Sequence, residues 1–152
     1  MTTLRDRIQN RLQASAIRAS NAVRAIPPLK WLLLTPLITR PGYAFATAVG
    51  FAWGSILSVG SIVETGKTAD HGGVILASGC PKWAFARGGT TIGGVYLTRD
   101  NVSPAVLEHE AVHREQWRRY GLALAVLYIA AGTDPLKNRF EIEAGLEKGN
   151  YR

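Results

Sequence analysis

The sequence predicts an α+β fold: a backing helix, a three-stranded antiparallel sheet and two key later helices, preceded by a basic N-terminal helix. Three observations predict it. Apolar residues recur at helical spacing near the N-terminus, short β-prone runs separated by glycine-containing turns follow, and capped helical segments come last. With 152 residues, 47% of them hydrophobic, the chain is too short for two ordinary domains. We therefore predict an arm over residues 1–30 and one domain over residues 31–152.

Cysteine content and charge exclude several kinds of site and partner. Cys80 is the only cysteine, so an internal disulfide, a four-cysteine zinc site and a cysteine-ligated iron–sulfur cluster are excluded. The net charge of +7 is concentrated in residues 1–42, which contain seven basic side chains and one acidic side chain. A membrane surface is therefore a candidate partner of the arm. Nucleic acid is not expected, because residues 1–30 contain no aromatic side chain and no recognised binding motif.

The arm is predicted to form a basic amphipathic helix that ends at Pro27-Pro28. Its apolar residues recur at helical spacing along one side, and most of its arginines lie off that side. This apolar stripe comprises Leu4, Ile8, Leu12, Ala16, Ala19, Val23 and Ile26. Such a helix either packs on the domain or a partner, or lies on a membrane with its cations on lipid headgroups.

The middle of the chain allows a membrane-spanning and a soluble interpretation. Residues 43–63 contain no charged side chain, and this stretch is long enough to cross a bilayer. Residues 55–64 and 74–78, however, are β-prone, and a spanning helix would leave the second run without a strand to pair with. We therefore predict a helix over residues 43–53 behind a meander whose third strand is Thr90–Thr98. A cytoplasmic location is expected, with membrane association as the alternative.

The chain after the third strand is predicted to be helical. Ser103 is a good N-cap, and Pro104 occupies the first helical position, where its missing N–H costs nothing. This helix should run through Arg119 or Tyr120, with Gly121 as a stop or a kink. Residues 122–131 predict a short buried helix, and residues 135–148 predict the last one.

The Ser103-capped helix contains an H-E-x-x-H sequence. His109 and His113 are four residues apart, so both imidazoles project from one helical face and can share a metal ion. Neutral imidazole suits Zn²⁺, which lowers the pKa of a bound water toward ~7, although iron(II) accepts similar ligands. Glu110 can accept the proton of that water as it attacks a carbonyl and later donate it to the leaving amine. The sequence therefore predicts a zinc-dependent metallopeptidase with Glu110 as general base and acid.

This part of the chain resembles the zincin metallopeptidases, from the strand before the motif to the C-terminal glutamates. In that group, the strand preceding the active-site helix binds extended substrate along its edge, and Thr90–Thr98 occupies that position here. The resemblance implies a peptide or protein substrate. It also implies that Gly94, Val95 and Tyr96 contact this substrate.

The third metal ligand distinguishes the zincin branches. The metzincin pattern is not met, because Gln116 and Arg119 stand where it has a glycine and a third histidine. In gluzincins such as the CAAX prenyl proteases, a Glu-x-x-Ala pattern on a later helix supplies the ligand, which implies Glu141. The size of the chain and the order of its elements also resemble the single-domain minigluzincins. A helical wheel instead groups Glu143 and Glu147 with the apolar residues, so Glu143 stays open as the alternative. In those relatives, an acidic residue directly after the alanine supports one of the ligand histidines. Gly145 stands at that position here, so the sequence does not show which group supports the histidine.

Other residues and another function class are also candidates. The oxyanion of a tetrahedral intermediate needs a hydrogen-bond donor, for which Tyr96, Tyr120 and Tyr128 are available. His71 lies in the predicted hairpin turn and could contact substrate. The alternative function is a membrane-associated adaptor or a non-catalytic metal-binding protein, anchored by the arm and residues 43–63.

Overall fold

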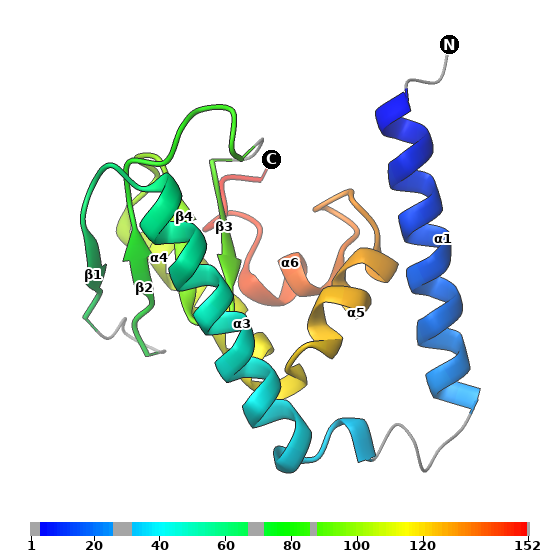
Figure 1. The fold of residues 1–152 in the computed structure, drawn as a ribbon. Coiled ribbons are helices and arrows are strands. Elements are labelled where there is room, and N and C mark those ends of the chain that lie inside the picture. Colours follow the sequence, from blue (N-terminus) through cyan, green and yellow to red (C-terminus); the bar gives the residue numbers. More distant parts are fainter. Residues whose placement is uncertain (1–3, 26–31, 67–71, 86–87, 152) are drawn as a thin grey trace.

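The fold is α+β, as predicted, with helices packed on a four-stranded sheet (Figure 1). The computed structural model describes the chain apart from residues 1–3, 26–31, 67–71, 86–87 and 152. The predicted helix end at Pro27-Pro28, the domain boundary at residue 30 and His71 lie outside the described residues. Those three expectations stay predictions.

The sheet is mixed rather than antiparallel throughout. It contains β1 (Ile62–Glu64), β2 (Ile75–Ala77), β3 (Gly89–Ile92) and β4 (Val95–Thr98). The strand order is β1-β2-β4-β3, in which β2 and β4 are parallel and the two outer pairs are antiparallel. The predicted three-stranded antiparallel meander is therefore wrong in its strand number and in one pairing, because the predicted third strand is a hairpin of two strands.

The turn between β3 and β4 needs glycine. Gly93 has a φ of 62°, which L side chains rarely adopt. A Cβ at Gly93 would also lie 2.3 Å from the backbone nitrogen of Thr47 on the helix that covers the sheet. The hairpin turn therefore packs directly on that helix, and this contact divides the β-prone run into two strands.

Helix α3 (Pro36–Leu57) covers the face of the sheet that carries Val95 and Leu97. It is longer than the predicted helix over residues 43–53. At its C-terminal end, the first residues of the predicted β-prone run over residues 55–64 are helical. Small residues form its inner side and let its backbone approach the sheet closely; they are Ala46, Gly50 and Gly54. None of the helices in the described part of the chain has the length and hydropathy that a bilayer span requires.

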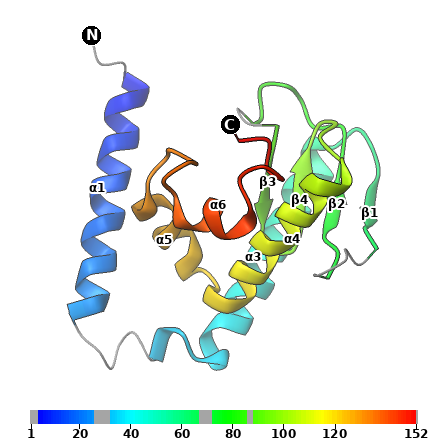
Figure 2. The ribbon, with the colours of Figure 1, turned by 180° about the vertical axis from the view of Figure 1, so that it is seen from behind.

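Helix α4 (Pro104–Tyr120) lies on the opposite face of the sheet (Figure 2). Its predicted start is confirmed, since the Ser103 hydroxyl accepts a hydrogen bond from the Val106 backbone nitrogen at 3.3 Å. Its predicted stop is confirmed as well, because Gly121 caps the helix with a φ of 55°. Val106 packs against Tyr96 of β4, and this contact holds the H-E-x-x-H segment against the sheet.

Helix α5 (Ala123–Ala131) has the predicted position but not the predicted burial. Only Leu124 in this helix is buried. Helix α1 (Leu4–Ala25) lies beside it, as both views show (Figures 1 and 2), and buries Ala16 and Ser20. The N-terminal part of the predicted apolar stripe of α1 is exposed, so the arm helix forms but is only partly covered.

Helix α6 (Arg139–Ala144) is much shorter than the helix predicted over residues 135–148. Asn138 sets its start, because the side-chain oxygen of this residue accepts a hydrogen bond from the Phe140 backbone nitrogen at 3.0 Å. Gly145 ends it with a φ of 90°. Between these two ends, Glu141 is buried and Glu143 is not.

Candidate metal centre

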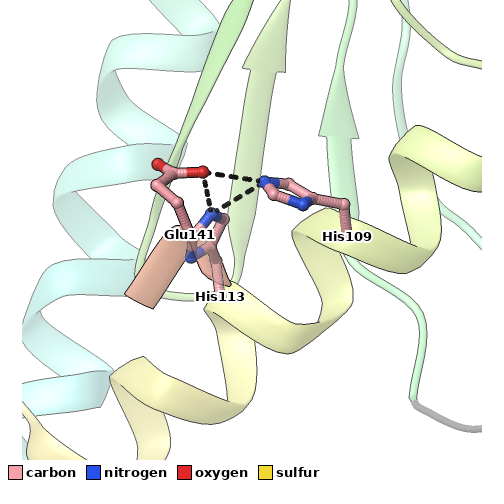
Figure 3. Close-up of side chains that lie close together, drawn as sticks. All are labelled: His109, His113 and Glu141. Atoms are coloured by element: carbon pink, nitrogen blue, oxygen red, sulfur yellow. Dashed lines mark hydrogen bonds and ion pairs between the residues drawn. The ribbon is translucent and has the colours of Figure 1, made fainter. Parts of the chain in front are cut away.

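Three buried side chains from α4 and α6 point at one spot (Figure 3). The Nε2 atoms of His109 and His113 are 3.1 Å apart, and Oε2 of Glu141 lies 3.1 Å from the first and 3.5 Å from the second. Ligand atoms at the ~2.0–2.1 Å typical of zinc are separated by about 3.3 Å around a tetrahedron. The three atoms therefore have the spacing of three corners of a tetrahedral zinc site, and their donor types suit that metal.

Hydrogen bonds fix the orientation of both imidazoles. The Nδ1 atom of His109 donates to the Gly145 carbonyl at 3.0 Å, and that of His113 donates to Oε1 of Gln116 at 2.8 Å. The Gln116 orientation is set because its amide nitrogen donates to the Phe140 carbonyl at 3.0 Å. A proton on each Nδ1 leaves the Nε2 lone pair free to face the shared spot. The Gly145 carbonyl thus takes the supporting role that the sequence leaves unassigned.

Glu141, and not the alternative Glu143, lies beside the histidines. Its second carboxylate oxygen accepts a hydrogen bond from the Tyr128 hydroxyl. Glu143 points elsewhere, toward the amide of Gln116 at 3.0 Å and the guanidinium of Arg119 at 3.1 Å. The structure therefore brings together the residue set that the Glu-x-x-Ala pattern implies.

The electrostatic environment of the three side chains favours a cation. Burial opposes ionisation of Glu141, but hydrogen bonds with His109 and His113 outweigh it and hold the pKa of this carboxyl well below its usual range. Burial likewise opposes protonation of His113, yet its hydrogen bond with Glu141 and the charge of Glu110 raise its pKa. Negative potential that favours a proton on an imidazole also favours a metal ion between the ligands.

Glu110 lies next to the cluster with properties suited to proton transfer. Burial raises the pKa of its carboxyl, while the charge of His113 and a hydrogen bond from Thr91 oppose this effect. The Thr91 hydroxyl donates to Oε2 of Glu110 at 2.6 Å. A carboxylate whose pKa is raised toward neutrality can both take up and return a proton.

A cleft of about 640 Å³ gives access to this cluster. Glu110, His113 and Glu141 line it, together with residues of α5 and Leu12 of α1. The arm helix therefore contributes to the site, which its sequence does not indicate. The C-terminal Tyr151 lines the same cleft and also carries no sequence signal for this position.

The strand that borders the cleft is β3, which corrects the expectation for Gly94, Val95 and Tyr96. These residues lie in or next to β4, which is paired on both sides, and Val95 and Tyr96 are fully buried. Strand β3 is an edge strand, and all its residues line the cleft. The indole of Trp117 donates to the Thr91 carbonyl at 3.0 Å and holds this strand beside α4.

Among the three tyrosines considered as oxyanion donors, Tyr128 alone lines the cleft. The Tyr96 hydroxyl donates to the Asn101 carbonyl at 3.0 Å within the core. Tyr120 packs edge-on against Phe140. Tyr128 therefore stays as the candidate donor, with its hydroxyl on Glu141.

The three supporting groups differ in how far the sequence could have revealed them. Gln116 lies three residues after His113, a spacing that places both on one helical face. Tyr128 and the Gly145 carbonyl belong to other segments, and nothing in the local sequence marks them.

No protein-family model, curated protein sequence or solved structure matches the chain. The resemblance to the gluzincins therefore stays a prediction. The geometry and the chemistry of the three-ligand cluster are what indicate a function.

Proposed function

We propose that the chain is a zinc-dependent metallopeptidase of the gluzincin type. The observation that supports this most is the spacing of the His109, His113 and Glu141 ligand atoms, which matches three corners of a tetrahedral zinc site. Glu110 stands at the cleft side of this cluster, where a general base is needed.

His109, His113 and Glu141 would hold the ion, and the cleft would leave its remaining position to substrate and water. Zinc bound there would supply Lewis-acid chemistry, polarising the scissile carbonyl and acidifying water. Hydrogen bonds donated by the two Nδ1 atoms to the Gly145 carbonyl and to Oε1 of Gln116 favour the tautomer with a free lone pair on Nε2, as metal ligation requires.

The side chains around the cluster account for the remaining steps of hydrolysis. Glu110 accepts a proton from water as the water oxygen bonds to the carbonyl carbon of the peptide. It then donates this proton to the amide nitrogen, and the C–N bond breaks to release an amine and a carboxylic acid. The edge of β3 would hold the peptide in an extended form. The Tyr128 hydroxyl, which donates to Glu141 in the structure, would have to turn away from that carboxylate to donate to the oxyanion.

Metal analysis combined with a cleavage assay tests this function. We expect the purified protein to carry about one equivalent of zinc and to cleave casein, with cleavage lost after chelation and restored by zinc. Bound zinc with no cleavage of casein or of a mixed peptide library would instead support a non-catalytic metal-binding protein. Absence of tightly bound metal would contradict both.

Thr91→Val should change the pH dependence of cleavage. The hydrogen bond from Thr91 stabilises the ionised form of Glu110, so its loss raises the pKa of that carboxyl. Because the ionised form is the active base, the acidic limb of the kcat/KM profile should move toward higher pH. Thr90→Val, at the neighbouring position of β3, is the matched control and should leave this limb in place. An unchanged profile in Thr91→Val would show that the bond does not tune the base.

A further inference from the structure

Helix α3 exposes a continuous apolar face on the side turned away from the sheet. Leu37, Phe45 and Ile56 are 86%, 61% and 75% exposed, and about half of each of Phe51 and Trp53 is exposed. We call these five residues the α3 outer face. All other exposed positions of the helix are also apolar except Arg40 and Ser55. Exposed apolar surface on this scale is typical of a binding surface rather than of one that faces water.

Two side-chain hydroxyls along α3 are satisfied within the helix. The Ser55 hydroxyl donates to the Phe51 carbonyl at 2.9 Å, within the helix. The Thr47 hydroxyl donates to the Tyr43 carbonyl at 2.8 Å. Hydroxyls bonded to a carbonyl of the preceding turn are compatible with a hydrocarbon environment, because no polar atom is left without a partner. The α3 outer face therefore suits lipid better than it suits solvent.

The inner side of α3 is held by the sheet, so only the outer side is available. A Cβ at Gly50 would lie 2.6 Å from the Ile92 carbonyl oxygen, and one at Gly54 would lie 2.9 Å from the Ala77 side chain. Such close packing keeps the helix flat against the domain. An apolar helix fixed in this way can enter the interface of a bilayer sideways but does not cross it.

Cations lie at the N-terminal end of the same face. Arg40 is exposed and follows Leu37 by three positions, which places both on one side of the helix. Together with Arg118 and Arg119 it lines a hollow of about 670 Å³. Arg118 and Arg119 have carboxylate partners, whereas Arg40 forms no ion pair with any described residue. The chain as a whole has a net charge of +7, and α3 itself contains no acidic side chain, so the charge of the protein complements a negative surface.

We propose that the protein docks peripherally on an anionic lipid bilayer through the α3 outer face, with the guanidinium of Arg40 on lipid phosphate. A second copy of the chain fits this face less well, because two chains that each have a net charge of +7 repel one another. An anionic bilayer instead accepts the apolar side chains and neutralises the arginines. This proposal does not depend on the metal centre.

Vesicle co-sedimentation of the full chain tests the docking. We expect binding to vesicles of phosphatidylcholine with a quarter phosphatidylglycerol, and much weaker binding to pure phosphatidylcholine. Phe45→Ser with Ile56→Ser should lower the partition coefficient more than about tenfold, because two large apolar side chains leave the interface. Arg40→Gln should weaken binding to the anionic vesicles alone.

A matched control carries two comparable substitutions on the other side of the sheet. Val102, just before α4, is 42% exposed, and Ile142, on α6, is 51% exposed. Val102→Ser with Ile142→Ser should bind vesicles as the unmodified chain does. Equal losses in both double variants, or no binding to either kind of vesicle, would overturn the proposal. The proposal would also be overturned if the unmodified chain dimerised in analytical ultracentrifugation and bound no vesicles, and if Phe45→Ser with Ile56→Ser abolished that dimerisation.

Discussion

Glu110→Gln is expected to reduce kcat for peptide hydrolysis by about 100- to 10 000-fold. The amide keeps the size of the carboxylate and can still accept the hydrogen bond from Thr91. It cannot take a proton from water, so the attacking oxygen and the leaving amine lose their proton carrier. Glu110 is not one of the three ligand residues, and zinc content should therefore stay at the level of the unmodified protein.

Glu115→Gln is the matched control for this substitution. It makes the same chemical change on the same helix, but Glu115 pairs with Arg118 at the surface, away from the metal cluster. Cleavage by this variant should be within about twofold of the unmodified chain, because an exposed ion pair contributes little. If Glu110→Gln were as active as the unmodified protein, Glu110 would have no part in the mechanism. If the variant lost both activity and zinc, Glu110 would have a structural role instead.

The sequence predicts α4 well because both of its ends carry local signals. Ser103 accepts the capping hydrogen bond, and Gly121 takes the positive φ that stops the helix. The run over residues 90–98 is different, since Gly93 turns the chain where it meets Thr47 of α3. That contact joins residues far apart in sequence, so no local pattern could reveal that the third strand is a hairpin.

The choice of third ligand shows the same limit. A helical wheel over residues 135–148 assumes one regular helix, whereas Asn138 and Gly145 confine α6 to the six residues between them. Within this short helix the buried residues are Phe140, Glu141 and Ala144, which puts Glu141 on the inner side. The Glu-x-x-Ala pattern implies the same residue without any assumption about helix length. The two histidines need neither argument, because four-residue spacing on one helix places them together.

Glu141→Gln is expected to lower zinc affinity more than about 100-fold, since loss of a ligand should exceed the ~10- to 100-fold cost of losing a supporting contact. The substitution removes the one negative charge that touches both Nε2 atoms, at 3.1 and 3.5 Å. Titration against a chromogenic chelator at fixed pH measures the change. Circular dichroism of the metal-free variant shows whether the fold is kept.

Glu143→Gln makes the same change two residues away and separates the two candidates. Glu143 contacts the amide of Gln116 and the guanidinium of Arg119, so it reaches the metal ligands only through Gln116 and His113. We expect its zinc affinity to fall less than about tenfold, below the range typical of a direct supporting partner. If Glu143→Gln instead lost zinc while Glu141→Gln kept it, α6 would have to turn by about 160° to 200° to exchange the two carboxylates. Asn138 and the buried Phe140 ring hold α6 in place against that rotation, and for this reason we expect Glu141 to be the ligand.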